Sequence, residues 1–199
     1  IRKQLPDLKF DVLKEAALIG PKIGAELRKD ALYAIIAALL AIMGYVAIRF
    51  KFIYGIGAVI ALFHDVLVAL GVLSIIDGVF PFLDVEISQE VMAAFLTLVG
   101  ISVNDTVVVF DRIRENLKIY RSLSLGEVIN RSLNDTLSRT IITQGTVLLV
   151  LVVLLFFGGE VTRGFAFTLT VGTIAGTYSS IYIASAIVLD WSLRKKKMA

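Results

Sequence analysis

An aspartate within an apolar stretch is the first residue whose type and position suggest a functional role. Asp105 lies in ISVNDTVVVFDRIREN, with the apolar runs AAFLTLVG before it and VVVF after it. A charged side chain in such surroundings costs about 2.5–3.5 kcal/mol on membrane-insertion scales, which makes it a functional candidate by default. Its polar neighbours Asn104 and Thr106 extend it into a patch that must face other helices or a water-filled cavity. The chemistry that a buried carboxylate offers is the binding and release of a proton.

Arg139 is the basic residue best placed to influence this carboxylate. It begins the next apolar run, which enters the membrane from the same side, so its long side chain is expected to reach toward Asp105. Burial favours a protonated acid, whereas a nearby arginine favours the carboxylate. Asp105 would then hold a proton when Arg139 is withdrawn, and proton binding would be coupled to helix movement. The alternative is a structural ion pair or an arginine that extends to the membrane surface.

A second acid, Asp65, follows His64 near the middle of another apolar run, IALFHDVLVALG. Adjacent residues on a helix point about 100° apart, so the two side chains cannot face one partner squarely. We predict supporting polar roles for both. Because His64 is the only histidine and the chain has no cysteine, neither a metal site nor a cofactor is expected.

Apolar runs long enough to cross a membrane must position these residues. The sequence is 57% hydrophobic and 19% charged, with a mean hydropathy of +0.85. Runs of about 18 residues or more can cross a hydrocarbon core of roughly 30 Å. Five such runs are present, at 31–48, 54–76, 91–110, 140–157 and 165–189. They lack the alternation of barrel strands, so we predict an all-α polytopic membrane protein whose bundle covers residues 31–190.

The placement of charge predicts the membrane topology. Lysine and arginine gather in alternate loops and in the tail 191–199, whereas the intervening loops are mainly acidic. The positive-inside rule therefore places the C-terminus in the cytoplasm and the N-terminal segment outside. Topology also explains the net charge of +3, so no nucleic-acid partner is implied.

Segments beside the spans carry further predictions. In the cytoplasmic loop 111–138, Ser124 and Glu127 form a capping box before an amphipathic helix. This helix is expected either along the inner membrane surface or against the ends of the bundle. Residues 1–30 are charged and lack the apolar core of a signal peptide. We expect them to be the remnant of an exported α+β domain, with an earlier span missing.

The last span is rich in small residues. Gly172 and Gly176 are spaced as in motifs that let helices approach closely. We expect packing within the bundle, with contact to another subunit as the alternative.

Several stretches of the chain resemble the SecF side of the SecD–SecF family of protein-export membrane proteins, within the RND superfamily. GISVNDTVVVFDRIREN carries the most specific likeness, and GPKIGAELRKDA, FHDVLVALG, LNDTLSRTIIT and GTYSSIYIASAIVLDW follow the family's order. SecD members usually read closer to V-D-A-N-V where this chain has V-N-D-T-V at residues 103–107. The resemblance covers nearly the whole chain.

This resemblance implies a fold and a function. The fold is an RND-type bundle with five of the six SecF spans, lacking the first span and most of the exported domain thought to grip the preprotein. The function is that of a proton-driven accessory subunit, not an enzyme, which with SecD assists preprotein translocation through the SecYEG translocon of the cytoplasmic membrane. Asp105 and Arg139 match the family's proton-pathway residues, and a further aspartate would come from SecD. Asp65 matches the family's H-D dipeptide.

Three other functions remain as alternatives. The first is an RND-type exporter subunit for lipids or small molecules, in which buried acids also relay protons. The second is an intramembrane aspartyl protease with Asp65 and Asp105 sharing a proton. Such proteases usually carry Y-D and G-x-G-D motifs, whereas the contexts here are H-D and N-D. The third is a non-catalytic membrane scaffold.

Overall fold

The computed structural model describes residues 21–49, 52–79 and 88–198, and every regular element in this part of the chain is helical. In order, these are α2 (Pro21–Arg49), α3 (Phe52–Val79), α4 (Gln89–Ile119), α5 (Leu125–Phe157), α6 (Gly159–Ser179), the π-helix η2 (Ser180–Ala184) and α7 (Ser185–Met198). The predicted all-α fold is confirmed for these residues. The predicted α+β remnant falls largely on residues 1–20, which lie outside the described residues, while 21–30 form the first turns of α2.

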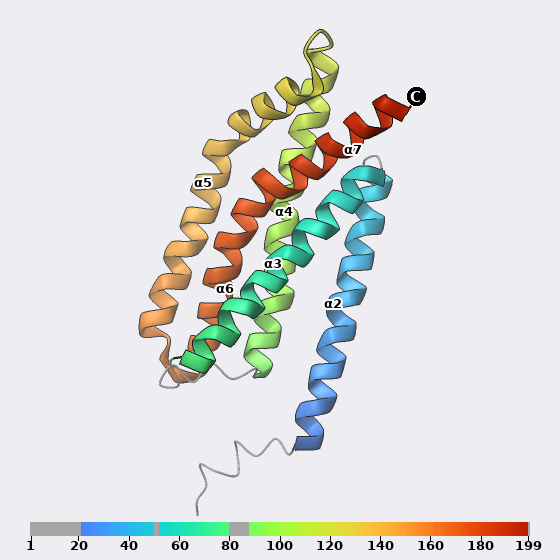
Figure 1. Cartoon of the computed structure of the whole chain (residues 1–199). Coiled ribbons are helices and arrows are strands. Elements are labelled where there is room, and N and C mark those ends of the chain that lie inside the picture. The colour runs from blue at the N-terminus through green and yellow to red at the C-terminus, as the bar shows by residue number, and fades with distance from the viewer. Residues whose placement is uncertain (1–20, 50–51, 80–87, 199) are drawn as a thin grey trace, which may run out of the picture.

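The helices run along the length of the molecule as an up-and-down bundle (Figure 1). Helices α4 and α6 pack on each other, α3 and α5 also pack on α6, and α2 lies against α3 and α4. The α4–α5 turn and the end of α7 lie at one end of the bundle, and the α5–α6 turn lies at the other (Figure 1). Three helices therefore surround α6 and can all place side chains beside it.

In the part of the chain that the structure describes, four helical segments are long and apolar enough to cross a membrane. They are Phe52–Ile76, Gln89–Ile119, Leu125–Phe157 and Val161–Lys195, and each contains one of the predicted spans. The predicted span at 31–48 falls on α2, whose apolar part, Leu32–Val46, is shorter. A fifth crossing by α2 therefore stays a prediction.

The segment predicted as a loop at 111–138 is mostly helical. Helix α4 continues to Ile119, and α5 begins at the predicted capping box, in which the backbone N–H of Ser124 donates to Oε2 of Glu127 over 2.8 Å. The capping box is thus confirmed. The amphipathic helix and the fourth predicted span are one continuous helix, because no residue between Leu125 and Phe157 interrupts the helical hydrogen bonding.

The first turns of α5 pack against the bundle. Val128 and Ile129 are buried, and Ile129 belongs to the apolar cluster that includes Phe110 and Ile113 of α4. The structure therefore favours the second of the two predicted positions for this helix. A buried polar contact adds to the packing, since Nδ2 of Asn116 donates to Oγ of Ser132 over 3.0 Å and to Oδ2 of Asp135 over 3.1 Å.

We predict that Asn116→Ala destabilises the junction between α4 and α5. The substitution removes two hydrogen bonds and leaves the fully buried Ser132 hydroxyl without this donor, at a cost of about 1–3 kcal/mol. Asn130→Ala is the matched control, because Asn130 is exposed on α5, the other helix of this junction, and surface substitutions usually change stability by less than about 0.5 kcal/mol. Thermal unfolding in detergent measures both, and equal midpoints would contradict the assignment.

Two apolar clusters lie along the bundle axis with polar groups between them. In α4, Leu98 and Val99 belong to one cluster, and Val109 and Phe110 belong to the other. The buried polar residues of α4 between them are Ser102, Asp105 and Thr106. Buried polar residues of α3 and of the last span lie at the same level, because they bond to these α4 residues. We call this level the polar layer.

Candidate functional site

Asp105 is held in the polar layer by hydroxyl groups from two other helices. Its side chain is buried, in agreement with its predicted inward position. Thr140 of α5 donates to Oδ1 over 3.1 Å, and Ser180, the first residue of η2, donates to Oδ2 over 2.9 Å. One carboxylate therefore links α4, α5 and the last span.

The Ser180 hydroxyl has a second acceptor in reach. Its Oγ lies 3.1 Å from the backbone oxygen of Thr177, besides the 2.9 Å contact with Asp105. A hydroxyl has one hydrogen and cannot donate fully to both. An ionised carboxylate can only accept, whereas a protonated one also donates. Protonation of Asp105 can therefore turn the Ser180 hydrogen from the carboxylate to the Thr177 carbonyl.

Asp65 of α3 forms a second buried acid site in the same layer. Its side chain is fully buried, and Ser102 of α4 donates to Oδ2 over 2.5 Å. The hydroxyl of Ser179, in the last span, donates to the backbone oxygen of Gly176 over 3.2 Å. Nδ1 of His64 lies 3.2 Å from Oδ1, so the two neighbours contact each other rather than a common third group. Two serines of α4 and the last span, Ser102 and Ser180, thus donate to different acids.

The two glycines of the last span face α4 of the same chain. A Cβ at Gly172 would lie 2.5 Å and 2.6 Å from the two terminal carbons of Leu98. A Cβ at Gly176 would lie 3.2 Å from Oγ of Ser102 and 3.4 Å from Oδ2 of Asp65. Both glycines therefore make room for packing inside the bundle, and Gly176 makes room for the contact between Asp65 and Ser102.

The structure does not bring Arg139 to Asp105. Arg139 precedes Thr140 and so lies at the level of the polar layer, but its side chain is exposed, and no ion pair joins it to Asp105 among the described residues. Thr140 occupies the inward position instead, because neighbouring residues on a helix point about 100° apart. An approach of Arg139 to Asp105 stays a prediction.

The other predicted polar residues divide between the interior and the surface. Thr106 is buried and donates to the backbone oxygen of Ser102 over 3.1 Å. Asn104 is exposed on the outward side of α4, toward α5. No group of three or more histidine and acidic residues suited to a metal ion occurs in the described part of the chain.

The hydroxyl groups that donate to the acids are not predicted from the sequence. In the sequence, Ser180 is one of the small residues of the last span, and Ser102 and Thr140 carry no prediction. Ser102 lies three residues before Asp105, on the same helix face, which is a signal that could have been used. No comparable signal marks Ser180, since its direction depends on the π-helical turn that it begins.

The chain was compared with known proteins and solved structures. A family model described as "Protein export membrane protein SecD/SecF, C-terminal" matches residues 3–194. Protein translocase subunit SecF of Rhodothermus marinus is 52% identical over 194 residues, which are 98% of this chain and 62% of that protein. Protein translocase subunit SecDF of Thermus thermophilus is 46% identical over 190 residues, 96% of this chain and 25% of that protein.

The same fold occurs in solved structures of SecDF. The crystal structure of SecDF, a translocon-associated membrane protein from Thermus thermophilus, matches with a TM-score of 0.75 and 46% identity over 87% of this chain and 23% of that one. A second SecDF crystal structure, in a super-membrane-facing form, matches with a TM-score of 0.76, 44% identity and 90% coverage of this chain. The present sequence spans about 62% of the length of the SecF relative. The expected likeness to SecF is thereby confirmed, and the chain belongs to the SecD/SecF family of protein-export membrane proteins.

Proposed function

We propose that this chain is the membrane part of a SecF subunit that works with SecD in the cytoplasmic membrane and uses the proton-motive force to assist preprotein translocation through SecYEG. Relatives named SecF and SecDF that match nearly the whole chain support this function. The subunit is a transport accessory rather than an enzyme. An exported domain outside this sequence would hold the preprotein, so the chain supplies the part that responds to protons.

The observation that carries the proposal is the buried Asp105 with its two hydroxyl donors. Thr140 and Ser180 come from different helices, so the carboxylate's hydrogen bonds depend on how α5 and the last span sit against α4. When Asp105 takes up a proton, Ser180 can donate to Thr177 instead, which loosens the link between α4 and η2. Since π-helical turns occur frequently at functional sites, we assign to η2 the position at which the last span moves relative to α4.

Arg139 acts in this proposal as the group that drives release of the proton. Its side chain is outside the bundle, one residue from Thr140. A guanidinium that swings toward Asp105 favours the carboxylate over the acid. Proton uptake and release would then alternate with the position of α5.

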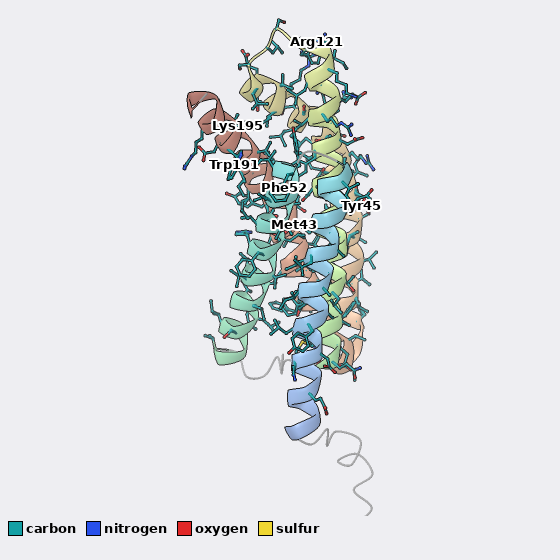
Figure 2. All side chains as sticks on the ribbon, turned by 90° about the vertical axis from the view of Figure 1, so that its right-hand side faces the viewer. Met43, Tyr45, Phe52, Arg121, Trp191 and Lys195 are labelled. Carbon is teal, nitrogen blue, oxygen red and sulfur yellow. The ribbon has the colours of Figure 1, made fainter. Side chains whose placement is uncertain are left out.

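We place SecD against the outward side of α4 and α5. Asn104 and Arg139 are exposed there within apolar helices, and a polar or charged group facing lipid is costly. We also place the C-terminus in the cytoplasm. In support, Arg121 at the α4–α5 turn and Lys195 of α7 lie toward the same end of the bundle (Figure 2), as the positive-inside rule requires for one membrane face.

The test is export into vesicles that contain SecYEG, with or without the full-length subunit and SecD. An imposed proton gradient should stimulate translocation at least about threefold more when the subunit is present, and a protonophore should remove that gain. Translocation that starts on the ATPase alone should survive. A gain that persists without the gradient would support a scaffold, and gradient-driven release of lipid or small molecules without preprotein would support an exporter.

A further inference from the structure

Asp65 is a buried acid that the proposed proton cycle leaves without a role. Its side chain is fully buried, and its Oδ2 accepts a hydrogen bond from Ser102 of α4 over 2.5 Å. This length is typical of a hydroxyl that donates to an ionised carboxylate. An isolated charge in the interior is strongly disfavoured, so an ionised Asp65 depends on hydrogen-bond donors and on a base nearby.

His64 is the base that can meet this need. It is the only basic side chain within the five predicted spans. Its Nδ1 lies 3.2 Å from Oδ1 of Asp65, which is within hydrogen-bonding distance. The imidazole is 34% exposed, whereas the carboxylate is not exposed at all. The pair therefore joins the surface of α3 to the polar layer.

We infer that His64 and Asp65 form a second proton-binding pair, and that the last span couples this pair to Asp105. The inference rests on the proposed proton-driven function and adds a second titrating site to it. Before uptake, the pair is a carboxylate and a neutral imidazole with its hydrogen on Nδ1. A hydronium ion gives a proton to Nε2 of His64 while the hydrogen on Nδ1 passes to Oδ1 of Asp65. The products are water, a neutral imidazole and a neutral carboxylic acid.

The last span lies directly against this second acid. A Cβ at Gly176 would lie 3.4 Å from Oδ2 of Asp65 and 3.2 Å from Oγ of Ser102. Four residues later, about 6 Å along the axis, Ser180 donates to Asp105 over 2.9 Å. One turn of the last span thus contacts both acid sites, so a movement at η2 changes the surroundings of both.

Few other titratable groups lie near Asp65. Helices α2 and α4 and the last span pack on α3, and Asp105 is the only acid within their predicted spans. On α3 itself, Tyr54 lies about 16 Å away along the axis. The remaining titratable side chains in these spans are tyrosines that are more than half exposed, namely Tyr33, Tyr45, Tyr178 and Tyr182. The charge of Asp65 therefore depends on His64 and Asp105.

Asp65→Asn separates a titrating role from a structural one. Asparagine keeps an oxygen that accepts from Ser102 and gains an N–H group that can donate to Nδ1 of His64, but it does not titrate. We expect the midpoint of thermal unfolding in detergent to stay unchanged. The gradient-driven gain in export should fall at least about fivefold, since positioned proton-transfer groups usually contribute more than this.

The matched control is Asp190→Asn, which replaces an exposed acid of α7 and should keep the full gain. All variants are made in the full-length subunit and measured with SecD in the vesicles described above. A full gain with Asp65→Asn would overturn the inference, because the hydrogen bonds of Asp65 would then suffice.

Infrared spectroscopy of the same purified proteins observes the proton directly. Lowering the pH should raise a carbonyl band of a protonated carboxyl group that Asp65→Asn lacks. His64→Gln keeps hydrogen-bonding groups but removes the base, so it should shift the pH midpoint of this band. If no band depends on both pH and Asp65, the inference is wrong, whatever the stability of the variants.

Asp105→Asn tests the coupling and separates this inference from the proposed function. The pH midpoint of the Asp65 band should differ between this variant and the unsubstituted protein, and identical midpoints would overturn the coupling. If Asp105→Asn abolishes the gain while Asp65→Asn retains it, the second site is wrong and the proposed function stands. If Asp105→Asn leaves the gain intact, the proposed function is wrong, and the Asp65 band still decides whether the pair binds a proton.

Discussion

Replacement of Asp105 by asparagine is expected to abolish the stimulation of preprotein export by a proton gradient. Asparagine has nearly the size of aspartate and keeps an oxygen that accepts from Thr140 or Ser180, but it cannot take up or release a proton. The bundle should therefore assemble normally. Export that depends on the ATPase alone should continue, so the defect appears only when the gradient is imposed.

The measurement is translocation into vesicles with the full-length subunit and SecD, with and without the gradient. Asp190→Asn is the matched control, because Asp190 is an exposed acid on α7 that pairs with Arg194 on the surface. It should keep the full response. Arg139→Lys keeps a charge but loses the planar guanidinium, and we expect a partial loss. An Asp105→Asn subunit that responds fully to the gradient would reduce Asp105 to a structural acid.

Gly172→Leu is expected to have the largest effect on stability. A Cβ at this position would already lie 2.5 Å from a terminal carbon of Leu98, which is 1% exposed, so any movement of that side chain must displace other packed groups. Extra atoms in a packed core typically cost about 1–3 kcal/mol and occasionally more. A whole leucine side chain at this contact should reach the upper end of that range.

Gly71→Leu is the control that separates the effect of packing on stability from the effect of helix propensity. Leucine is a better helix former than glycine by about 0.5–1 kcal/mol, so both variants gain this contribution and only Gly172→Leu suffers the clash. The midpoint of thermal unfolding in detergent should fall for Gly172→Leu and stay or rise for Gly71→Leu. Similar midpoints for the two would show that α4 and α6 are not held at this distance.

The burial of Asp105 could be predicted from the sequence because of its energetic cost in lipid. A charge within an apolar helix has few stable positions, and a place inside the bundle is one of them. The capping box at Ser124 could be predicted for a related reason, since it depends only on residues three apart in the chain. The first prediction rests on one dominant free energy and the second on local geometry. The structure agrees with the burial of Asp105 and with the capping box at Ser124.

The partners of the acids could not be predicted because they depend on helix rotation. Arg139 was expected beside Asp105, but a rotation of about 100° separates it from Thr140, and the structure gives the inward position to Thr140. Ser180 depends on η2 in the same way, since a π-helical turn changes the direction of every residue around it. Hydrophobic runs indicate where a helix lies in the sequence and leave its angle about its own axis open.

The position of the polar layer between two apolar clusters has a consequence for the membrane as an electrical barrier. Along the axis, an ion at Asp105 would meet Leu98 and Val99 in one direction and Val109 and Phe110 in the other, all nearly inaccessible to solvent. A charge without polar partners in such surroundings is strongly disfavoured. The bundle therefore insulates along its length, and it can hold an acid at its centre without letting ions leak through, as the proposed use of the proton-motive force requires.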